Sequence, residues 1–259
     1  MKLNSDDVDL LAAKLDDAAQ NARAIPQLTS ETQFDVDDAY AIQRAGVVLR
    51  KLRADPLVGM KMGLTSRAKT AQMGVKEPIY GHLTARMILD DGGAVLRKDH
   101  VHPRVEPEIA YLLRKDLVGP VTPVQALDAV ECCCCALELI DSRYKDFKFT
   151  LEDVVADNGS SSRFVLGNVR RPHDFDCGNL GMVMEKNGAV AEIGSSAAFY
   201  DHPARSLAFL ANTLAKTGDV LRAGMIVMTG GATAAIALAP GDHVRVRVDG
   251  LGSAEFFVS

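Results

Sequence analysis

Two glutamates stand two positions apart inside an otherwise apolar run, RVEPEIAYLL, at residues 104–113. Alternate side chains of a β-strand point to the same face, so Glu106 and Glu108 are expected to project together. A third carboxylate, Glu138, lies in the apolar segment ALELID, where a lone glutamate is costly unless it is paired or bound to a cation. Carboxylate oxygens are the ligands that Mg²⁺ takes, with Mn²⁺ as a substitute. The pattern predicts a divalent-metal site built from Glu106, Glu108 and Glu138.

A solvated sheet face is the alternative interpretation of the 104–113 stretch, since Glu-x-Glu is common on edge strands. Pro107 stands between the two glutamates, and prolines in strands mark edges or special local geometry because they cannot donate a ladder hydrogen bond. The spacing therefore leaves open whether the two acids are only hydrated or hold a cation.

The composition excludes several classes of partner. The 259 residues are 47% hydrophobic and 24% charged with a net charge of −5, so the chain has no electrostatic footprint for nucleic acid or an anionic membrane. No apolar stretch resembles a signal peptide or a membrane helix. Four of the five cysteines are consecutive, Cys132–Cys135, and neighbouring side chains diverge too far to form a metal or disulfide framework. We interpret the cysteines as reduced, buried apolar residues of a cytoplasmic protein.

The elements that must position these acids can be outlined from periodicity. Residues 5–22 are typical of a helix with Ser5 as N-cap, and 35–56 of a second helix, so residues 1–56 are predicted to form a small helical N-terminal subdomain before a catalytic β-rich domain at 57–259. Strands are expected at 57–66, 104–114, 135–142, 225–231 and 243–258, and helices at 66–74, 123–134 (capped by Thr122) and 203–218. Helices and strands do not alternate strictly, which favours an α+β fold with a large antiparallel or mixed sheet.

Taken together, the segments GMKMGLTS, EPIYGHLT, HPRVEPEIAYLL, ALELIDSRYKDFKF, VVADNGSSSRFVLG and VMTGG resemble the fumarylacetoacetate hydrolase superfamily. The resemblance covers roughly residues 57–259 and points to the hydratase/decarboxylase branch of the catechol meta-cleavage pathways. It implies a mixed β-roll after a small helical N-terminal region. It also implies that Glu106, Glu108 and Glu138 hold the metal and that Lys61 borders the substrate as a catalytic residue.

One position separates the two activities of this branch. Hydratases of the branch usually carry an aspartate for proton transfer in a P-D-[FY]-G motif, whereas this chain has Ile79 in the segment PIYG. Isoleucine cannot move a proton, so the resemblance favours a carboxy-lyase. The implied reaction is Mg²⁺-dependent conversion of the dicarboxylate 2-oxo-3-hexenedioate to 2-hydroxypenta-2,4-dienoate and CO₂ in aromatic-compound catabolism. The alternatives are a hydratase acting on that dienoate, or a non-catalytic subunit that stabilises a partner hydratase.

Five further residues are predicted to bind substrate: Thr65, Ser160, Ser161, Thr229 and Gly230. The serines and the backbone N–H groups of the VMTGG segment are suited to binding carboxylates, although a solvated loop and a structural Gly-Gly turn are equally compatible with the spacing. Asp141 and Arg143 are predicted to form a supporting ion pair. The resemblance also implies a homo-oligomer and a possible complex with the pathway hydratase.

Overall fold

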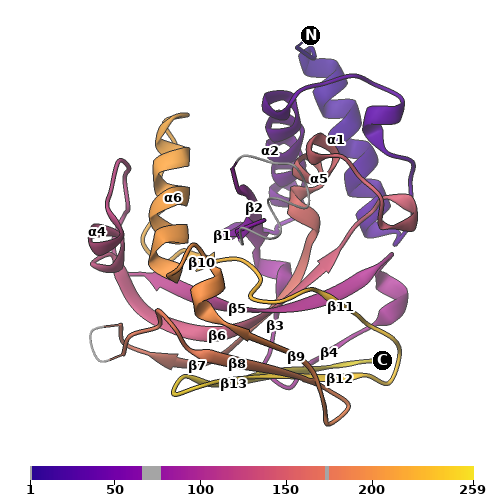
Figure 1. The fold of residues 1–259 in the computed structure, drawn as a ribbon. Helices are drawn as coiled ribbons and strands as arrows, with labels where there is room; N and C mark the ends of the chain where they lie inside the picture. The colour runs from indigo at the N-terminus through magenta and orange to yellow at the C-terminus, as the bar shows by residue number, and fades with distance from the viewer. Residues whose placement is uncertain (1, 66–76, 173–174) are drawn as a thin grey trace.

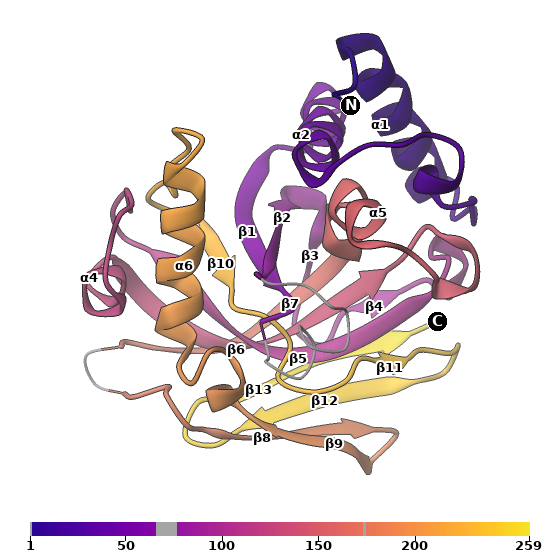
Figure 2. The ribbon, with the colours of Figure 1, turned by 45° about the horizontal axis from the view of Figure 1, so that its top comes forward.

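Two β-sheets lie one over the other in the computed structural model, which describes residues 2–65, 77–172 and 175–259 (Figure 1). The larger sheet has the order β2-β1-β10-β5-β6-β7-β3, with β11 paired to β5 beside β10. Its strands are β1 Leu57–Gly63, β2 Ile79–Thr84, β3 Ile88–Leu89, β5 Pro103–Leu113, β6 Val130–Asp141, β7 Ser161–Arg170, β10 Ile226–Met228 and β11 Ile236–Ala237. Figure 2 shows that this sheet is strongly curved.

The smaller sheet has the order β4-β13-β12-β8-β9 and closes the convex side of the larger one. Its strands are β4 Ala94–Val95, β8 Gly181–Lys186, β9 Ala189–Ser195, β12 His243–Val248 and β13 Gly252–Val258. Parallel pairs occur at β1–β10, β3–β7 and β4–β13, and the remaining pairs are antiparallel. The prediction of an α+β fold with a mixed sheet is confirmed.

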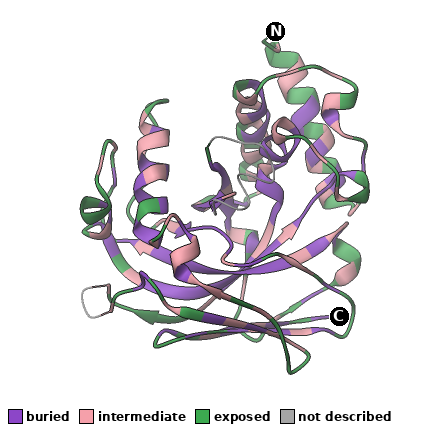
Figure 3. Cartoon of the chain, in the orientation of Figure 1, coloured by how far each residue is buried: buried purple, intermediate pink, exposed green. Residues whose placement is uncertain are grey.

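Alternation along β5 and β6 divides their side chains between two environments. One set joins the apolar core that also contains the inward side chains of β12 and β13, and it comprises Val105, Ile109, Tyr111, Leu137 and Leu139. The other set lies on the concave face and includes the glutamates. Figure 3 shows that both strands are buried over most of their length, so neither face of this part of the sheet is hydrated. The solvated-face interpretation is therefore wrong.

Helices occupy the concave side and the periphery. The N-terminal pair, α1 Ser5–Gln20 and α2 Val36–Leu52, shares an apolar cluster with α5 Leu151–Ala156. The others are α4 Pro123–Leu127, α6 Pro203–Ala215 and the 3₁₀ turns η1 Leu28–Ser30, η2 Ala85–Met87, η3 Arg97–Asp99, η4 Lys145–Phe147, η5 Asn158–Ser160 and η6 Ser196–Ala198. Within the described residues, no helix combines the length and apolarity needed to cross a membrane. The division of the chain at residue 56 stays a prediction, and the helix expected at 66–74 lies outside the described residues.

Two local predictions are corrected by the structure. Asn4, not Ser5, is the N-cap of α1, because its side chain accepts the hydrogen bond of the Asp7 N–H. The helix expected over 123–134 is capped by Thr122 as predicted, but it ends at Leu127, and the cysteine run belongs to β6. Pairing with β5 on one side and β7 on the other determines the conformation of this run, in which three of the four cysteines are buried.

Pro107 lies in a central strand, so of the two alternatives for a proline in a strand, a sheet edge or special local geometry, the second applies. Beyond Ala110 the strand pairs with β10, and before Glu106 it pairs with β11. The residues between β10 and β11 leave the regular ladder, although the Thr229 N–H donates to the Ile109 carbonyl and the Ala232 N–H to the Pro107 carbonyl. The proline therefore occupies the one stretch of β5 where a missing N–H donor costs no ladder hydrogen bond.

Arg143 organises the connection between β6 and β7. Its guanidinium pairs with Asp157 (Nε to Oδ1, 2.5 Å) and donates to the carbonyls of Asp141, Asp157 and Ser161. The predicted side-chain pair between Asp141 and Arg143 is wrong, because the Asp141 carboxylate accepts the N–H groups of Val101 and His102 instead. Burial raises the pKa of Asp157 to about 6 despite its cation.

Replacing Arg143 by methionine is expected to lower the free energy of unfolding by about 3–5 kcal/mol, because the Asp157 carboxylate then stays buried without its cation. Equilibrium unfolding in urea measures the change. Arg114→Met is the control, since Arg114 pairs with Asp128 at the exposed surface and its loss is expected to cost less than about 1 kcal/mol. Equal effects of the two substitutions would contradict the organising role of Arg143.

Candidate active site and metal centre

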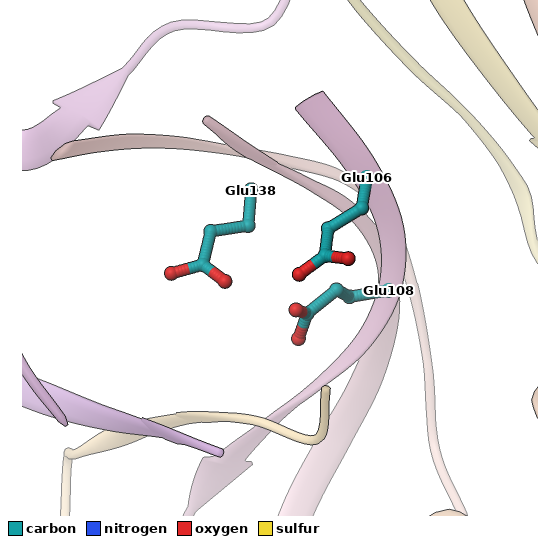
Figure 4. A group of neighbouring side chains, drawn as sticks. All are labelled: Glu106, Glu108 and Glu138. Atoms are coloured by element: carbon teal, nitrogen blue, oxygen red, sulfur yellow. The ribbon is translucent and has the colours of Figure 1, made fainter. Parts of the chain in front are cut away.

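Three carboxylates converge on the concave face of the larger sheet (Figure 4). Glu106 lies directly opposite Glu138 in the antiparallel register of β5 and β6, and Glu108 follows two residues along the same face. One oxygen from each side chain lies within 4.8 Å of the other two, and all three residues are buried. Like charges opposed across a ladder destabilise a sheet, so this cluster requires compensation.

Burial, together with the charges of Glu138 and Glu106, raises the pKa of Glu108 well above its usual value. Burial likewise raises the pKa of Glu138, against the effect of Lys61 on β1, whose Nζ lies 3.0 Å from Glu138 Oε2. Burial opposes the charge of Lys61 itself, but the three carboxylates outweigh it and raise the pKa of the lysine. One ammonium group cannot balance three carboxylates, so further positive charge or protons must be present at neutral pH.

The donor set fits a hard divalent cation. Glu108 Oε1 and Glu138 Oε1 are buried and accept no hydrogen bond from any residue within the described ranges. A buried carboxylate oxygen without a donor is costly, and coordination to a cation removes that cost. Oxygen ligands contributed by carboxylates suit Mg²⁺, which keeps part of its coordination for water or substrate. The three glutamates are the residues that would hold such an ion.

The chain that follows β10 crosses directly over the carboxylates. The Gly230 N–H donates to Glu108 Oε2 at 2.8 Å, and Gly230 has the left-handed φ of +110° that glycine tolerates. A Cβ on Gly231 would lie 2.0 Å from Glu106 Oε2, so only glycine allows this approach. The Gly-Gly pair therefore contacts the glutamates themselves.

A strained turn holds the opposite side of the site. Asn158, Gly159 and Ser160 all have left-handed φ values between +55° and +60°, which is unfavourable for the two non-glycine residues. The Asn158 side chain fixes the turn by bonding both the N–H and the carbonyl of His82 on β2. The turn directs the Gly159 carbonyl at Lys61 Nζ, 3.1 Å away.

A cavity of about 640 Å³ opens beside this cluster. Lys61, Glu106 and Ser160 contribute polar groups, and Ile79 contributes an apolar side chain next to the lysine. Most of the remaining lining is apolar: Leu64, Ile140, Phe147, Phe149, Val154, Ala198, Ala232, Ala234 and Ala235. The combination of a few polar groups with apolar walls suits a small anion that has an apolar middle section.

The predicted substrate-binding residues fall into two groups. Ser160 lines the cavity, and its buried hydroxyl has no hydrogen-bond partner within the described part of the chain. Thr65 packs against Gly230 at the edge of the carboxylate cluster. By contrast, Ser161 faces the sulfur of Met87, and the Thr229 hydroxyl bonds a carbonyl of β5. The structure therefore brings Thr65, Ser160 and Gly230 to the site, and the role of each predicted residue in binding substrate stays a prediction.

Two residues of the cavity were missed by the sequence analysis. Arg104 stands two positions before Glu106, so the alternation that pairs the glutamates also places Arg104 on their face. Its guanidinium lies 4.1 Å from the centre of the Phe147 ring. Phe147 could not be found from periodicity, because it belongs to an irregular turn with a left-handed φ of +55°.

Comparison with known proteins places this fold and site in a family. The family described as fumarylacetoacetate (FAA) hydrolase C-terminal matches residues 57–259. The chain belongs to the fumarylacetoacetate hydrolase family. The match begins at β1 and includes every residue of the carboxylate cluster and its lysine.

Individual proteins are also similar over nearly the whole chain. A 4-oxalocrotonate decarboxylase from a Pseudomonas species is 50% identical over 246 residues, which is 95% of this chain and 96% of the relative. The structure of 4-oxalocrotonate decarboxylase from Pseudomonas putida G7, complexed with magnesium and adipate, is 41% identical, with a TM-score of 0.97 over 100% of this chain and 99% of that one. A 2-hydroxyhexa-2,4-dienoate hydratase from Comamonas testosteroni is 36% identical over 93% of each chain.

Replacing Glu108 by glutamine is expected to weaken Mg²⁺ binding by more than about tenfold, because it removes a charged ligand. Loss of a residue that only supports a metal ligand already costs roughly 10–100-fold in metal affinity. Titration calorimetry with Mg²⁺ measures the affinity. Glu131→Gln is the matched control, since Glu131 is exposed on the same strand as Glu138. When a chelator has removed divalent cations, the Glu108→Gln protein is expected to be at least as stable as the wild type, because one buried acidic group has been removed. Unchanged Mg²⁺ affinity would refute the metal assignment.

Replacing Gly231 by alanine is expected to weaken divalent-cation binding while all three glutamates remain. The added Cβ would overlap the Glu106 carboxylate, which must rotate away from the cluster. Gly181→Ala on β8 is the control, because no atom lies within 4 Å of the Cβ it adds. Competition between Mn²⁺ and a coloured chelator provides the measurement, and equal affinities in the two variants would show that Gly231 plays no part.

Proposed function

We propose that this protein is a Mg²⁺-dependent carboxy-lyase that converts 2-oxo-3-hexenedioate (4-oxalocrotonate) to 2-hydroxypenta-2,4-dienoate and CO₂ in the catabolism of aromatic compounds, with Mn²⁺ as a possible substitute metal. The 50% identity to a 4-oxalocrotonate decarboxylase and the greater distance of the hydratase relatives support this assignment. The donor set of three buried carboxylates supports the metal.

One observation of the site carries the choice between decarboxylation and hydration. Ile79 is buried and lines the cavity beside Gly63 and Lys61, at the position where the hydratase motif has an aspartate. The described lining of the cavity contains no aspartate, histidine or tyrosine. Hydration needs a group that transfers a proton to or from water, and Ile79 cannot do so at the position where the hydratase motif has its aspartate.

The bond changes need no nucleophile from the protein. The C5–C6 bond of the substrate breaks and releases CO₂, and its electron pair forms a C4–C5 double bond. The former C3–C4 π electrons form a C2–C3 double bond, and the C2 carbonyl oxygen takes up the negative charge. Protonation of that oxygen gives the neutral enol of the product. The barrier falls if positive charge faces the C2 oxygen before the charge develops.

The chain supplies this environment with few groups. The glutamates would hold the divalent ion, which acts as a Lewis acid toward the 2-oxo-acid end of the substrate. Lys61 stays protonated because its pKa is raised, so its ammonium group adds a fixed cation and a proton donor beside the developing enolate. The apolar walls keep water from the middle of the substrate, which strengthens these electrostatic interactions.

Incubating the purified protein with 2-oxo-3-hexenedioate and Mg²⁺ tests the proposal. CO₂ release and the absorbance of the dienol product are expected to rise together and to stop when a chelator is added. Supplying the dienoate instead tests the hydratase alternative. Hydration of the dienoate without any CO₂ release from the dicarboxylate would overturn the proposal.

The intact glutamates and Lys61 argue against a purely non-catalytic subunit. Three further predictions accompany the proposed function. A homo-oligomer, and a complex with the hydratase that consumes the dienoate, remain predictions from the family resemblance. A cytoplasmic location likewise stays a prediction.

A further inference from the structure

Arg104 is a cation in the cavity that the proposed chemistry does not use. It is partly buried on β5, and its side chain lies on the concave face with Glu106. Among the described residues, no carboxylate lies within ion-pair distance of the Arg104 guanidinium, which lies over the Phe147 ring. A guanidinium that lines a largely apolar cavity without an anionic partner is suited to binding an anionic ligand.

The backbone that carries the Phe147 ring beneath Arg104 has an unfavourable conformation. Asp146 and Phe147 both have left-handed φ values, +58° and +55°, which non-glycine residues rarely adopt. The Phe147 ring is packed edge-on against Phe149, with centroids 5.3 Å apart, and against His102. This packing fixes the ring, and a fixed ring restricts the guanidinium that lies over it.

The spacing along β5 matches a short dicarboxylate. Arg104 and Glu106 are two positions apart on the strand, a rise of roughly 6.6 Å, which is the scale of an extended six-carbon chain. Most of the cavity lining is apolar, as the methylene and vinyl carbons of such a ligand require. A ligand whose 2-oxo-acid end lies at the glutamates would therefore place its far carboxylate near Arg104.

We propose that Arg104, held over Phe147, binds the distal carboxylate of the substrate and thereby selects dicarboxylates over monocarboxylates; this inference rests on the proposed function. The contact exists in the substrate and is lost when C6 leaves as CO₂. The product consequently binds more weakly than the substrate. Because the interaction stabilises the ground state at least as well as the transition state, Arg104 acts on KM more than on kcat.

The test uses two 2-oxo acids that lack the C3–C4 double bond and so cannot decarboxylate by this route. 2-Oxoadipate carries the distal carboxylate, and 2-oxohexanoate lacks it. At saturating Mg²⁺, the wild type is expected to bind 2-oxoadipate about 10–100-fold more tightly, the usual range for a hydrogen-bonded charge pair. Arg104→Met is expected to bring the two affinities close together, and Arg104→Lys to give an intermediate ratio because one point charge replaces the bidentate fork.

Arg163→Met is the matched control, since Arg163 is also partly buried but lines a different cavity. It is expected to keep the wild-type ratio. A wild type without preference, or an Arg104→Met protein that keeps the preference, would overturn the inference. If the ratio collapses in Arg104→Met but the wild type releases no CO₂ from 2-oxo-3-hexenedioate, the role of Arg104 stands and the proposed function fails. With active enzyme, Arg104→Met is expected to raise KM for 2-oxo-3-hexenedioate more than it lowers kcat.

Discussion

Three carboxylates buried against one another on neighbouring strands impose the constraint on which the rest of this structure depends. Their mutual repulsion and loss of hydration oppose folding, and a sheet does not tolerate them without compensation. The surrounding groups compensate for this repulsion and loss of hydration. Lys61 supplies a cation and the Gly230 N–H supplies a hydrogen bond. The oxygens that accept no hydrogen bond from the described residues supply the reason for a metal.

The curvature of the larger sheet brings these groups together from distant parts of the chain. β10 lies between β1 and β5, so the lysine strand and the glutamate strand face one another across one intervening strand. The chain leaving β10 then crosses the glutamates, and it passes the stretch of β5 where Pro107 donates no hydrogen bond. The Gly-Gly segment thus reaches the site at the place where the pairing of the sheet is irregular.

Periodicity predicted the parts of the site that lie on regular strands. The i, i+2 rule placed Glu106 and Glu108 together, and the cost of an isolated acid in an apolar strand brought Glu138 to them. The rest depended on tertiary contacts that local patterns do not encode. Arg143 pairs with Asp157 instead of Asp141, because the turn at residues 158–160 brings Asp157 under its guanidinium. The cysteine run has no period, so only its pairing with two strands makes it a strand.

The position of the site on a rigid strand also affects which ligands it can select. Loops can adjust to ligands of different length, whereas the distance between two side chains on one strand is fixed by the ladder on both sides. In the proposed site Glu106 is a metal ligand, and Arg104 is the next residue on the same face of β5. The strand would then set the separation between the group that polarises one end of a ligand and the cation available to the other end. Under this proposal, the strand that carries two of the metal ligands also selects the ligand by its chain length and its two anionic ends.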